Sequence, residues 1–321
     1  MKKCILILFF SVFFFSLQAE TKIDKQTFVY SVKEGDTLRL DKYDSFVRTE
    51  KKPCIIYMFG GGFYSGNRDR ADYIPYFNQL VENGYVVVSI DYRLGFRKAK
   101  DKLAGNPDIQ ALASLLGNTV SMAVEDLFDA TAFVLSNADD WGVDKNLIVA
   151  NGSSAGAISV LQAEYEICNK SELARKLPDG FNYAGVMSFA GAIFSMNGDL
   201  KWAQKPAPIL FFHGDADSNV PYDKIELMTL GFYGSKHICL QLDDLKAPYY
   251  FYDIENAAHE IARLPMELNL NEIMTFLDKF VKKKENLAIY SKVRQLDKPE
   301  VNKDFEIFDY IKSNFFSIAL N

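Results

Sequence analysis

The chain has 321 residues, of which 49% are hydrophobic and 24% are charged. These values are ordinary for a globular protein, and the length allows one large α/β domain or two small ones. The formal net charge of -6 provides no basic surface for a phosphate backbone, so the composition argues against a nucleic-acid partner.

The N-terminus has the features of a targeting segment. It starts with Met-Lys-Lys, a short basic region, continues with mostly apolar residues 5–17, and reaches the small residue Ala19. We therefore predict a signal peptide over residues 1–19 and a secreted or periplasmic protein. The apolar run is short for a bilayer span, so we expect no stable membrane insertion; an uncleaved anchor is the alternative.

The cysteines give no sign of a disulfide framework. Beyond residue 19 the chain has Cys54, Cys168 and Cys239, an odd number at wide spacing. This spacing also fits no zinc site, and Cys54 reads as a small core residue of an apolar strand. We expect neither a metal nor an organic cofactor.

The first elements after residue 20 are two strands and a turn. Residues 28–32 and 38–43 flank Glu34-Gly35-Asp36, a glycine-containing turn between alternating segments. Residues 53–59 form an apolar run bounded by proline and glycine, which is typical of a central strand. Gly60, Gly61 and Gly62 follow directly. Three glycines after a buried strand make sense where backbone N–H groups must approach a ligand closely.

The remaining chain alternates between strands and helices. Further strands are predicted at residues 85–90, 147–150, 185–190, 208–213 and 248–254, the last of these being the final strand. Helices are predicted at residues 71–83, 121–138, 155–166 and 268–282. We expect residues 191–205 to form an irregular connection.

This order predicts an α/β fold with a mostly parallel central sheet, helices on both faces, and a small lid or none. The domain would cover residues 20–283, with residues 284–321 as a C-terminal extension. In such sheets ligands bind outside the carboxyl ends of the strands. The loops after Phe59, Ala150, His213 and Ile254 all lie at such ends.

The sequence Gly152-Ser153-Ser154-Ala155-Gly156 joins a buried strand to a helix. A sharp turn of this kind is the context of a nucleophile elbow, in which the serine hydroxyl is exposed at the edge of the sheet. The two glycines allow the strand and helix backbones to approach closely. Ser154 would then be the nucleophile, and the Ala155 N–H would point to where negative charge develops.

A serine hydroxyl needs a base near neutral pH. Of the three histidines, His259 follows the last predicted strand, so its loop reaches the same edge as Ser154. Asp217, on the loop after the preceding strand, is the best acceptor for the second imidazole nitrogen. The order Ser154, Asp217, His259 is the chain order of α/β-hydrolases.

Other residues are candidates for the acid and the base that would assist Ser154. Asp215 could replace Asp217 as the orienting acid, or could brace the turn. His213 reads as a structural residue at a strand end, because as the base it would precede its own acid. His237 reads as a surface or loop residue.

Five motifs together resemble an α/β-hydrolase carboxylesterase of the feruloyl/acetyl-xylan esterase-like or hormone-sensitive-lipase-like groups. They are Phe-Gly-Gly-Gly-Phe at 59–63, Asp-Tyr-Arg-Leu at 91–94, Gly-Ser-Ser-Ala-Gly at 152–156, His-Gly-Asp-Ala-Asp-Ser-Asn-Val-Pro at 213–221 and Ala-His-Glu at 258–260. The resemblance covers about residues 28–282. Two positions depart from many relatives: Phe59 stands in place of a histidine and Ser153 in place of an acid.

The resemblance implies a catalytic triad of Ser154, Asp217 and His259. It also implies an oxyanion hole of the Gly61, Gly62 and Ala155 N–H groups. The expected activity is hydrolysis of small or carbohydrate-linked esters, acetyl or hydroxycinnamoyl, through an acyl-enzyme. Aromatic residues are candidates to shape the pocket: Phe63, Tyr64, Phe194, Trp202 and Tyr222.

Two other functions share this catalytic domain. A serine peptidase of the prolyl-oligopeptidase type usually carries a large β-propeller ahead of the domain, and fewer than 60 residues precede the glycine loop here. A catalytically silent binding protein usually lacks one member of the triad, and none is missing from this sequence.

Overall fold

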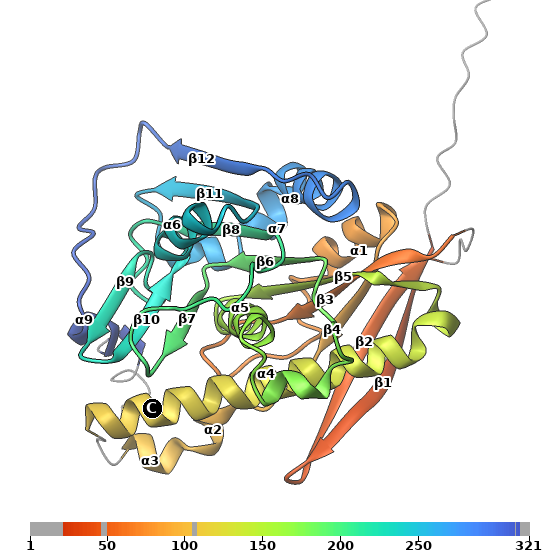
Figure 1. Cartoon of the computed structure of the whole chain (residues 1–321), viewed down its shortest axis with the longest axis horizontal. Helices are drawn as coiled ribbons and strands as arrows, with labels where there is room; N and C mark the ends of the chain where they lie inside the picture. The colour runs from red at the N-terminus through yellow and green to blue at the C-terminus, as the bar shows by residue number, and fades with distance from the viewer. Residues whose placement is uncertain (1–21, 46–49, 105–107, 312, 315–321) are drawn as a thin grey trace, which may run out of the picture.

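A computed structural model of the chain describes residues 22–45, 50–104, 108–311 and 313–314. The predicted signal peptide lies outside the described residues. The main body is a nine-stranded sheet with the strand order β1-β2-β4-β3-β5-β6-β8-β11-β12 (Figure 1). Its strands are β1 (Ile23–Lys33), β2 (Asp36–Ser45), β3 (Lys52–Met58), β4 (Val86–Ile90), β5 (Val143–Ser153), β6 (Gly185–Phe189), β8 (Ile209–Gly214), β11 (Tyr249–Glu255) and β12 (Ala288–Arg294).

The sheet is mostly parallel, as predicted. Strands β4 to β12 in this order all pair in parallel, whereas β1 and β2 form an antiparallel hairpin that joins the edge beside β4. The hairpin turn falls at Glu34 and Gly35, both with positive φ. Because the parallel strands share one direction, their carboxyl ends meet at one edge of the sheet.

Helices cover both faces of the sheet. Figure 1 shows α4 (Ile109–Trp141) and α5 (Ala155–Cys168) on one face, and α1 (Ile74–Glu82) and α8 (Leu270–Phe276) on the other. The smaller helical elements are α2 (Gly95–Lys98), α3 (Lys100–Ala104), η1 (Leu173–Lys176), α6 (Ser235–Leu245), η2 (His259–Ala262), α7 (Pro265–Leu268), η3 (Leu277–Lys282) and α9 (Ile307–Ile311).

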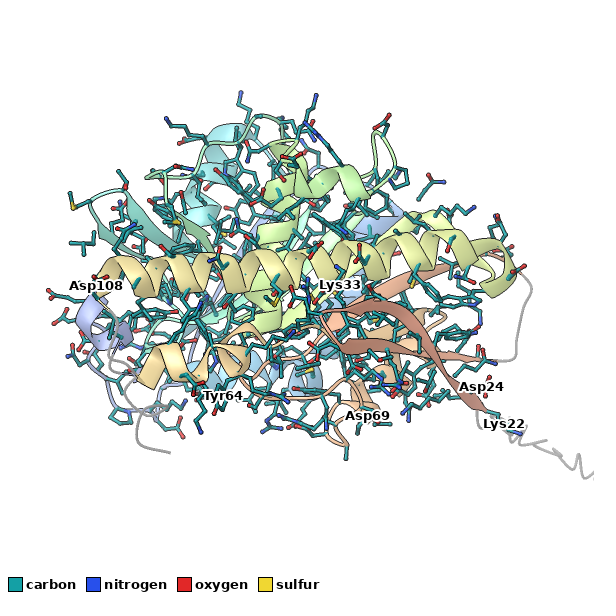
Figure 2. All side chains as sticks on the ribbon, turned by 90° about the horizontal axis from the view of Figure 1, so that it is seen from below. Lys22, Asp24, Lys33, Tyr64, Asp69 and Asp108 are labelled. Atoms are coloured by element: carbon teal, nitrogen blue, oxygen red, sulfur yellow. The ribbon has the colours of Figure 1, made fainter. Side chains whose placement is uncertain are left out.

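Helix α4 is much longer than the helix predicted at residues 121–138. It begins after Asp108, whose carboxylate accepts a hydrogen bond from the Ala111 N–H at 2.8 Å, and this cap satisfies one of the unpaired donors of the first turn. It ends at Gly142, which takes the left-handed conformation that favours glycine (φ 67°). In Figure 2 the helix runs along the whole face, from Asp108 past the end of the β1–β2 hairpin at Lys33. Lys33 forms ion pairs with Glu125, Asp126 and Asp129 of α4.

Two predictions about the second half of the chain were wrong. Residues 191–205 are not wholly irregular, because β7 (Ala192–Ser195) pairs with β10 (Leu230–Gly234), which pairs with β9 (Lys224–Leu227) in a separate antiparallel sheet. The strand predicted at 248–254 is also not the last: β12 follows and pairs with β11. Strands β7 and β12 each pair with a segment distant in sequence, which local patterns do not reveal.

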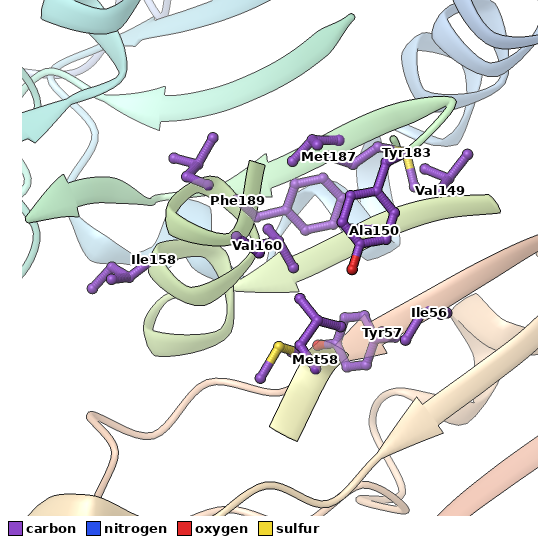
Figure 3. Close-up of a cluster of buried hydrophobic side chains, with 14 of the residues drawn as sticks. Ile56, Tyr57, Met58, Val149, Ala150, Ile158, Val160, Tyr183, Met187 and Phe189 are labelled. Carbon is purple, nitrogen blue, oxygen red and sulfur yellow. The ribbon is translucent and has the colours of Figure 1, made fainter. Parts of the chain in front are cut away.

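The core lies between the central strands and the helices. Strands β3 and β4 are fully buried over most of their length, which matches their continuous apolar sequences. Part of this cluster is shown in Figure 3, where side chains of β3, β5, β6 and α5 lie together. Its labelled members include Ile56, Tyr57, Met58, Val149, Ala150, Val160, Met187 and Phe189.

The two glycines around Ser154 lie where backbones touch, as predicted. A Cβ on Gly152 would stand 2.2 Å from the Gly156 carbonyl oxygen, and one on Gly156 would stand 2.2 Å from the Met58 carbonyl oxygen. No side chain fits at such distances. The glycines therefore allow α5 to pack directly on the end of β3.

This packing predicts a strong position dependence for glycine-to-alanine changes in helices. Gly156→Ala should lower the free energy of unfolding by about 3 kcal/mol, because the new methyl group meets backbone that cannot move aside. In Gly117→Ala of α4 the nearest atom is Phe194 Cε1 at 3.3 Å. That variant should stay within about 1 kcal/mol of the wild type, since alanine is the better helix former. Urea denaturation of both variants tests the contrast, and equal stabilities would contradict it.

Candidate active site

Ser154 occupies the turn between β5 and α5 in a strained conformation. Its φ of 51° and ψ of -118° lie outside the regions that L residues normally adopt. The turn is fixed by hydrogen bonds on both sides, from the Ser154 N–H to the Phe189 carbonyl and from the Ile158 N–H to the Ser154 carbonyl, both at 2.9 Å. Strain of this kind persists only where the surroundings determine it, and it aims the side chain away from the sheet.

The structure brings Ser154 and His259 into direct contact. The Ser154 Oγ lies 2.8 Å from the His259 Nε2. His259 opens η2, which follows the carboxyl end of β11, so residues 105 positions apart in sequence meet at one edge of the sheet. The imidazole is 27% exposed, and it therefore remains accessible from the pocket.

Asp217 lies on the other side of the same imidazole. Its Oδ2 is 2.7 Å from the His259 Nδ1. Because a carboxylate only accepts hydrogen bonds, this contact places the proton on Nδ1 and leaves Nε2 free to accept the serine hydroxyl. The other oxygen, Oδ1, accepts the N–H groups of Asn219 at 2.8 Å and Val220 at 3.0 Å.

The pKa of Asp217 lies below its ordinary value. Burial of the side chain, which is fully covered, would by itself raise this pKa. Hydrogen bonds from His213 and His259 outweigh that effect and stabilise the carboxylate. Asp217 is therefore held as an anion inside the protein.

The structure gives the other two histidines different partners. His213 is fully buried at the end of β8, with Nδ1 2.8 Å from the Ser235 Oγ and Nε2 3.4 Å from the Asp217 Oδ2. It thus supports Asp217 from behind and is not in contact with Ser154. His237 lies on α6, not in a loop, and pairs with Asp199 at 2.7 Å.

Asp215 is engaged elsewhere. Its Oδ1 accepts the Asn256 N–H at 2.6 Å, and its Oδ2 lies 2.7 Å from the Lys303 Nζ. These contacts join the loop after β8 to the loop after β11 and to the C-terminal segment. Of the two aspartates left open by the sequence, it is Asp217 that lies beside His259.

The glycine loop after β3 lies against the same turn. A Cβ on Gly60 would stand 3.1 Å from the Ser154 Cβ, so the two segments are in contact. The N–H groups of Tyr64 and Ser65 both donate to the Gly61 carbonyl at 3.0 Å, and Gly61 and Gly62 have φ values of 132° and 61°. The N–H groups of Gly61, Gly62 and Ala155 donate to no other described residue, which leaves them available to a ligand.

These residues line a pocket of about 450 Å³. Its walls come from the glycine loop, the Ser154 turn, the loops after β8 and β11, helix α4 and the C-terminal segment. The lining residues are Gly60, Gly61, Gly62, Phe63, Tyr64, Ser65, Arg70, Tyr73, Phe96, Leu116, Ser153, Ser154, Ala155, Ile158, Asn219, Val220, His259, Ala262, Arg263, Tyr310 and Asn314. The volume suits a small molecule.

Of the aromatic residues predicted to shape the pocket, Phe63 and Tyr64 line it. The prediction was wrong for the other three. Phe194 lines an adjoining apolar hollow beside α9, Trp202 packs on Tyr165 and donates to Gln241, and Tyr222 packs on His213. Local sequence gave a position for each ring but no direction for its side chain.

Sequence reasoning missed several pocket residues. Arg70, Arg263, Tyr310 and Asn314 line the pocket, and none lies in a recognised motif. For Arg263 a signal was present, because it follows His259 by four residues. The others depend on the path of the chain in space. No group of histidine, cysteine and acidic residues able to hold a metal ion occurs in the part of the chain that the structure describes.

Comparisons with known proteins find similarity to esterases. A family model described as BD-FAE matches residues 40–103. Gut esterase 1 of Caenorhabditis elegans is 34% identical over 115 residues, 36% of this chain and 18% of that protein. Fumonisin B1 esterase of Sphingopyxis macrogoltabida is 32% identical over 109 residues, 33% of this chain and 18% of that protein. The matches thus span about a fifth of the length of these relatives.

Solved structures extend the similarity to most of the chain. Thermogutta terrifontis esterase 2, phosphoramylated by tabun, superposes with a TM-score of 0.56 at 20% identity, over 82% of this chain and 96% of that one. The propionate-bound form of the same esterase gives a TM-score of 0.53 over 84% of this chain and 96% of that one. These likenesses confirm the predicted fold class. The chain therefore has the α/β-hydrolase fold, and its sequence resembles the carboxylesterase group within that fold.

Proposed function

We propose that this chain is a serine carboxylesterase that hydrolyses small or carbohydrate-linked esters, acetyl or hydroxycinnamoyl, through an acyl-enzyme. The observation that carries the proposal is the contact of 2.8 Å between the Ser154 Oγ and the His259 Nε2 at a strained strand-to-helix turn. The esterases among its relatives support the same reaction class.

In the first step Ser154 attacks the carbonyl carbon of the ester. A neutral serine hydroxyl is a weak nucleophile, so His259 accepts its proton through Nε2 as the new C–O bond forms. The same proton then passes to the leaving alcohol as the tetrahedral intermediate collapses. The alcohol departs and the acyl group remains on the Ser154 oxygen.

Asp217 is the proposed orienting acid. Its carboxylate holds the Nδ1 proton of His259 at 2.7 Å, which fixes the tautomer that accepts from serine. The negative charge also stabilises the imidazolium that forms during attack. Contacts with His213, Asn219 and Val220 keep the carboxylate in this orientation.

The Ala155, Gly61 and Gly62 N–H groups are the proposed oxyanion hole. Ala155 begins the 14-residue helix α5, so its N–H lies at the positive end of the helix dipole. The glycines offer two more donors from the loop after β3, which lies against the Ser154 turn. Loss of one such donor typically costs about 3–4 kcal/mol of transition-state stabilisation.

The second half of the reaction repeats these roles with water. His259 takes a proton from a water molecule, which attacks the acyl carbon and forms a second tetrahedral intermediate. Collapse of this intermediate returns the proton to the Ser154 oxygen and releases the carboxylic acid. The donors that stabilise the first oxyanion also stabilise the second.

Secretion is part of the proposal. One relative, Secreted lipase 5 of Gibberella zeae, is 30% identical over 119 residues, and the basic and apolar N-terminal residues fit a signal peptide. Within the described residues, no helix combines the length and the apolar character that crossing a bilayer demands.

Replacing the proposed nucleophile should remove the activity. Ser154→Ala should lower kcat for 4-nitrophenyl acetate and methyl ferulate by about 1,000-fold or more, because only the oxyanion-hole donors and substrate binding would still contribute to the rate. Ser153→Ala is the matched control, since the Ser153 hydroxyl donates to the Ala262 carbonyl at 2.7 Å instead of to His259. That variant should lose less than about tenfold.

Rates equal to wild type in Ser154→Ala would exclude the serine mechanism. A covalent label gives an independent readout, because Thermogutta terrifontis esterase 2 has been observed phosphorylated by paraoxon. Mass spectrometry should find a diethylphosphoryl group on Ser154 of the wild-type protein and none on Ser154→Ala. Preferential turnover of peptides over short esters would instead favour a peptidase.

The Asp217 carboxylate should matter for both rate and acid stability. Asp217→Asn should lower kcat by about 10³–10⁴-fold, because the amide favours the wrong imidazole tautomer. The wild-type pKa of Asp217 is below its unfolded value. Its contribution to stability is therefore complete above about pH 4 and is lost as the pH falls through the folded pKa.

Urea denaturation at pH 6 and pH 3 measures this effect. The wild type should lose about 1 kcal/mol more unfolding free energy across this interval than Asp217→Asn, which lacks the titrating group. Asp215→Asn provides a nearby comparison with a partly exposed aspartate. The same acid sensitivity in wild type and Asp217→Asn would show that Asp217 is not stabilised as an anion.

A further inference from the structure

The pocket around Ser154 has a one-sided distribution of charge. Apart from His259, the only ionisable side chains with a full charge among its described lining residues are Arg70 and Arg263. No aspartate or glutamate belongs to that lining. This is unusual in a chain whose net charge is -6, and it makes the two guanidinium groups the main charged features that a ligand would meet.

Arg70 is held in place from two sides. Its guanidinium carbon lies 4.6 Å from the ring centroid of Tyr73, a buried pocket residue. Its Nε lies 2.6 Å from the Asp72 Oδ1, and its Nη2 pairs with the Asp72 Oδ2. These contacts use one edge of the planar group. The Nη1 group of the guanidinium is left for another acceptor, and the contacts with Tyr73 and Asp72 already fix its orientation.

Arg263 is carried by the same segment as His259. It follows η2, and its N–H donates to the Glu260 carbonyl at 3.0 Å. Its Nη1 pairs with Glu267 on α7, which leaves Nε and Nη2 for other acceptors. The position of this arginine is therefore linked to that of the proposed base.

The two arginines share one acidic neighbour. The pKa of Asp72 is lowered chiefly by its hydrogen bond from Arg70, against the effect of burial, and the charge of Arg263 adds to the shift. Arg70 and Arg263 each have a carboxylate partner, Asp72 and Glu267, and Asp72 does not line the pocket. The second carboxylate, Glu267, does not line the pocket.

We infer that the pocket accepts esters that carry a carboxylate group in addition to the ester bond, with Arg70 and Arg263 as the residues that recognise it. This inference rests on the proposed esterase function and names its substrate class. A planar guanidinium binds a carboxylate through parallel, charge-assisted N–H···O bonds. A neutral ester of the same shape cannot form those bonds, so the arginine N–H groups stay hydrogen-bonded to water.

The expected size of the effect follows from exposure. The side chains of Arg70 and Arg263 are 47% and 45% exposed, so water and salt weaken their charges. We expect a preference of about tenfold in kcat/KM for a charged ester over its neutral counterpart at low salt. Raising the ionic strength should reduce that preference.

Two pairs of substrates separate the effect of charge from that of size. The mono-4-nitrophenyl ester of adipic acid is compared with 4-nitrophenyl hexanoate, which places the charge on the acyl side. The compound 4-acetoxybenzoate is compared with 4-acetoxybenzamide, which places it on the alcohol side. The wild type should prefer the charged member of at least one pair.

Arg70→Met and Arg263→Met should each lower the charged-to-neutral ratio of kcat/KM about tenfold. Arg70→Lys should recover only part of it, because lysine keeps the charge without the fork. Arg175→Met is the control, since Arg175 lies on η1 outside the pocket lining and is 77% exposed. Its ratio should equal that of the wild type.

Binding to Ser154→Ala keeps the inference separate from catalysis. Calorimetry on this variant should show tighter binding of 4-acetoxybenzoate than of 4-acetoxybenzamide, or of adipate monoester than of its neutral counterpart. Equal binding within both pairs, or arginine variants with unchanged ratios, would overturn the inference even if ester hydrolysis is observed. Absence of hydrolysis with all four esters would count against the proposed function, while the binding contrast would still decide the role of the arginines.

Discussion

The backbone turn at Ser154 is the constraint on which the rest of this site depends. A residue other than glycine with φ of 51° is held there because β5 lies between β3 and β6 in the sheet and α5 packs on β3. That packing needs the bare backbones of Gly152 and Gly156, each of which has a carbonyl oxygen 2.2 Å from where a Cβ would be. The strain at one residue is thus balanced by the burial of two central strands and a helix. Every other part of the pocket is positioned relative to this turn.

The acid and the histidine reach the turn through loops that brace each other. The loops after β8 and β11 leave adjacent parallel strands, so they begin side by side at one edge of the sheet. Asp215 joins them through the Asn256 N–H, and the Asp217 Oδ1 accepts two N–H groups from its own loop. The hydrogen bond that the His259 Nδ1–H donates to Asp217 therefore joins two loops that are already ordered. Little freedom remains to be lost when a substrate binds.

The parts of the fold that the sequence predicted are those encoded by short, local patterns. The central strands are continuous apolar runs, and the Ser154 turn and the loops of Asp217 and His259 each follow one of them. The first third of α4 does not follow from the sequence pattern because residues 109–120 include Gly117, Asn118 and Thr119, all weak helix formers, while the Asp108 cap lies well upstream. Strands β7, β9 and β10 are four or five residues long and pair only with one another. Arg70 and Tyr310 could not be predicted, because their place in the pocket wall depends on the three-dimensional course of whole segments.

The C-terminal segment follows a path with a consequence for how the molecule is made. After β12 pairs with β11 at the edge of the sheet, the chain continues to α9, and Tyr310 and Asn314 form part of the pocket wall, with the Asn314 amide donating to the Asn219 carbonyl at 3.0 Å. During translation the Ser154 turn leaves the ribosome long before these residues do. A nascent chain can thus fold its sheet while the pocket still lacks one side, and ligand selectivity is acquired only near the end of synthesis.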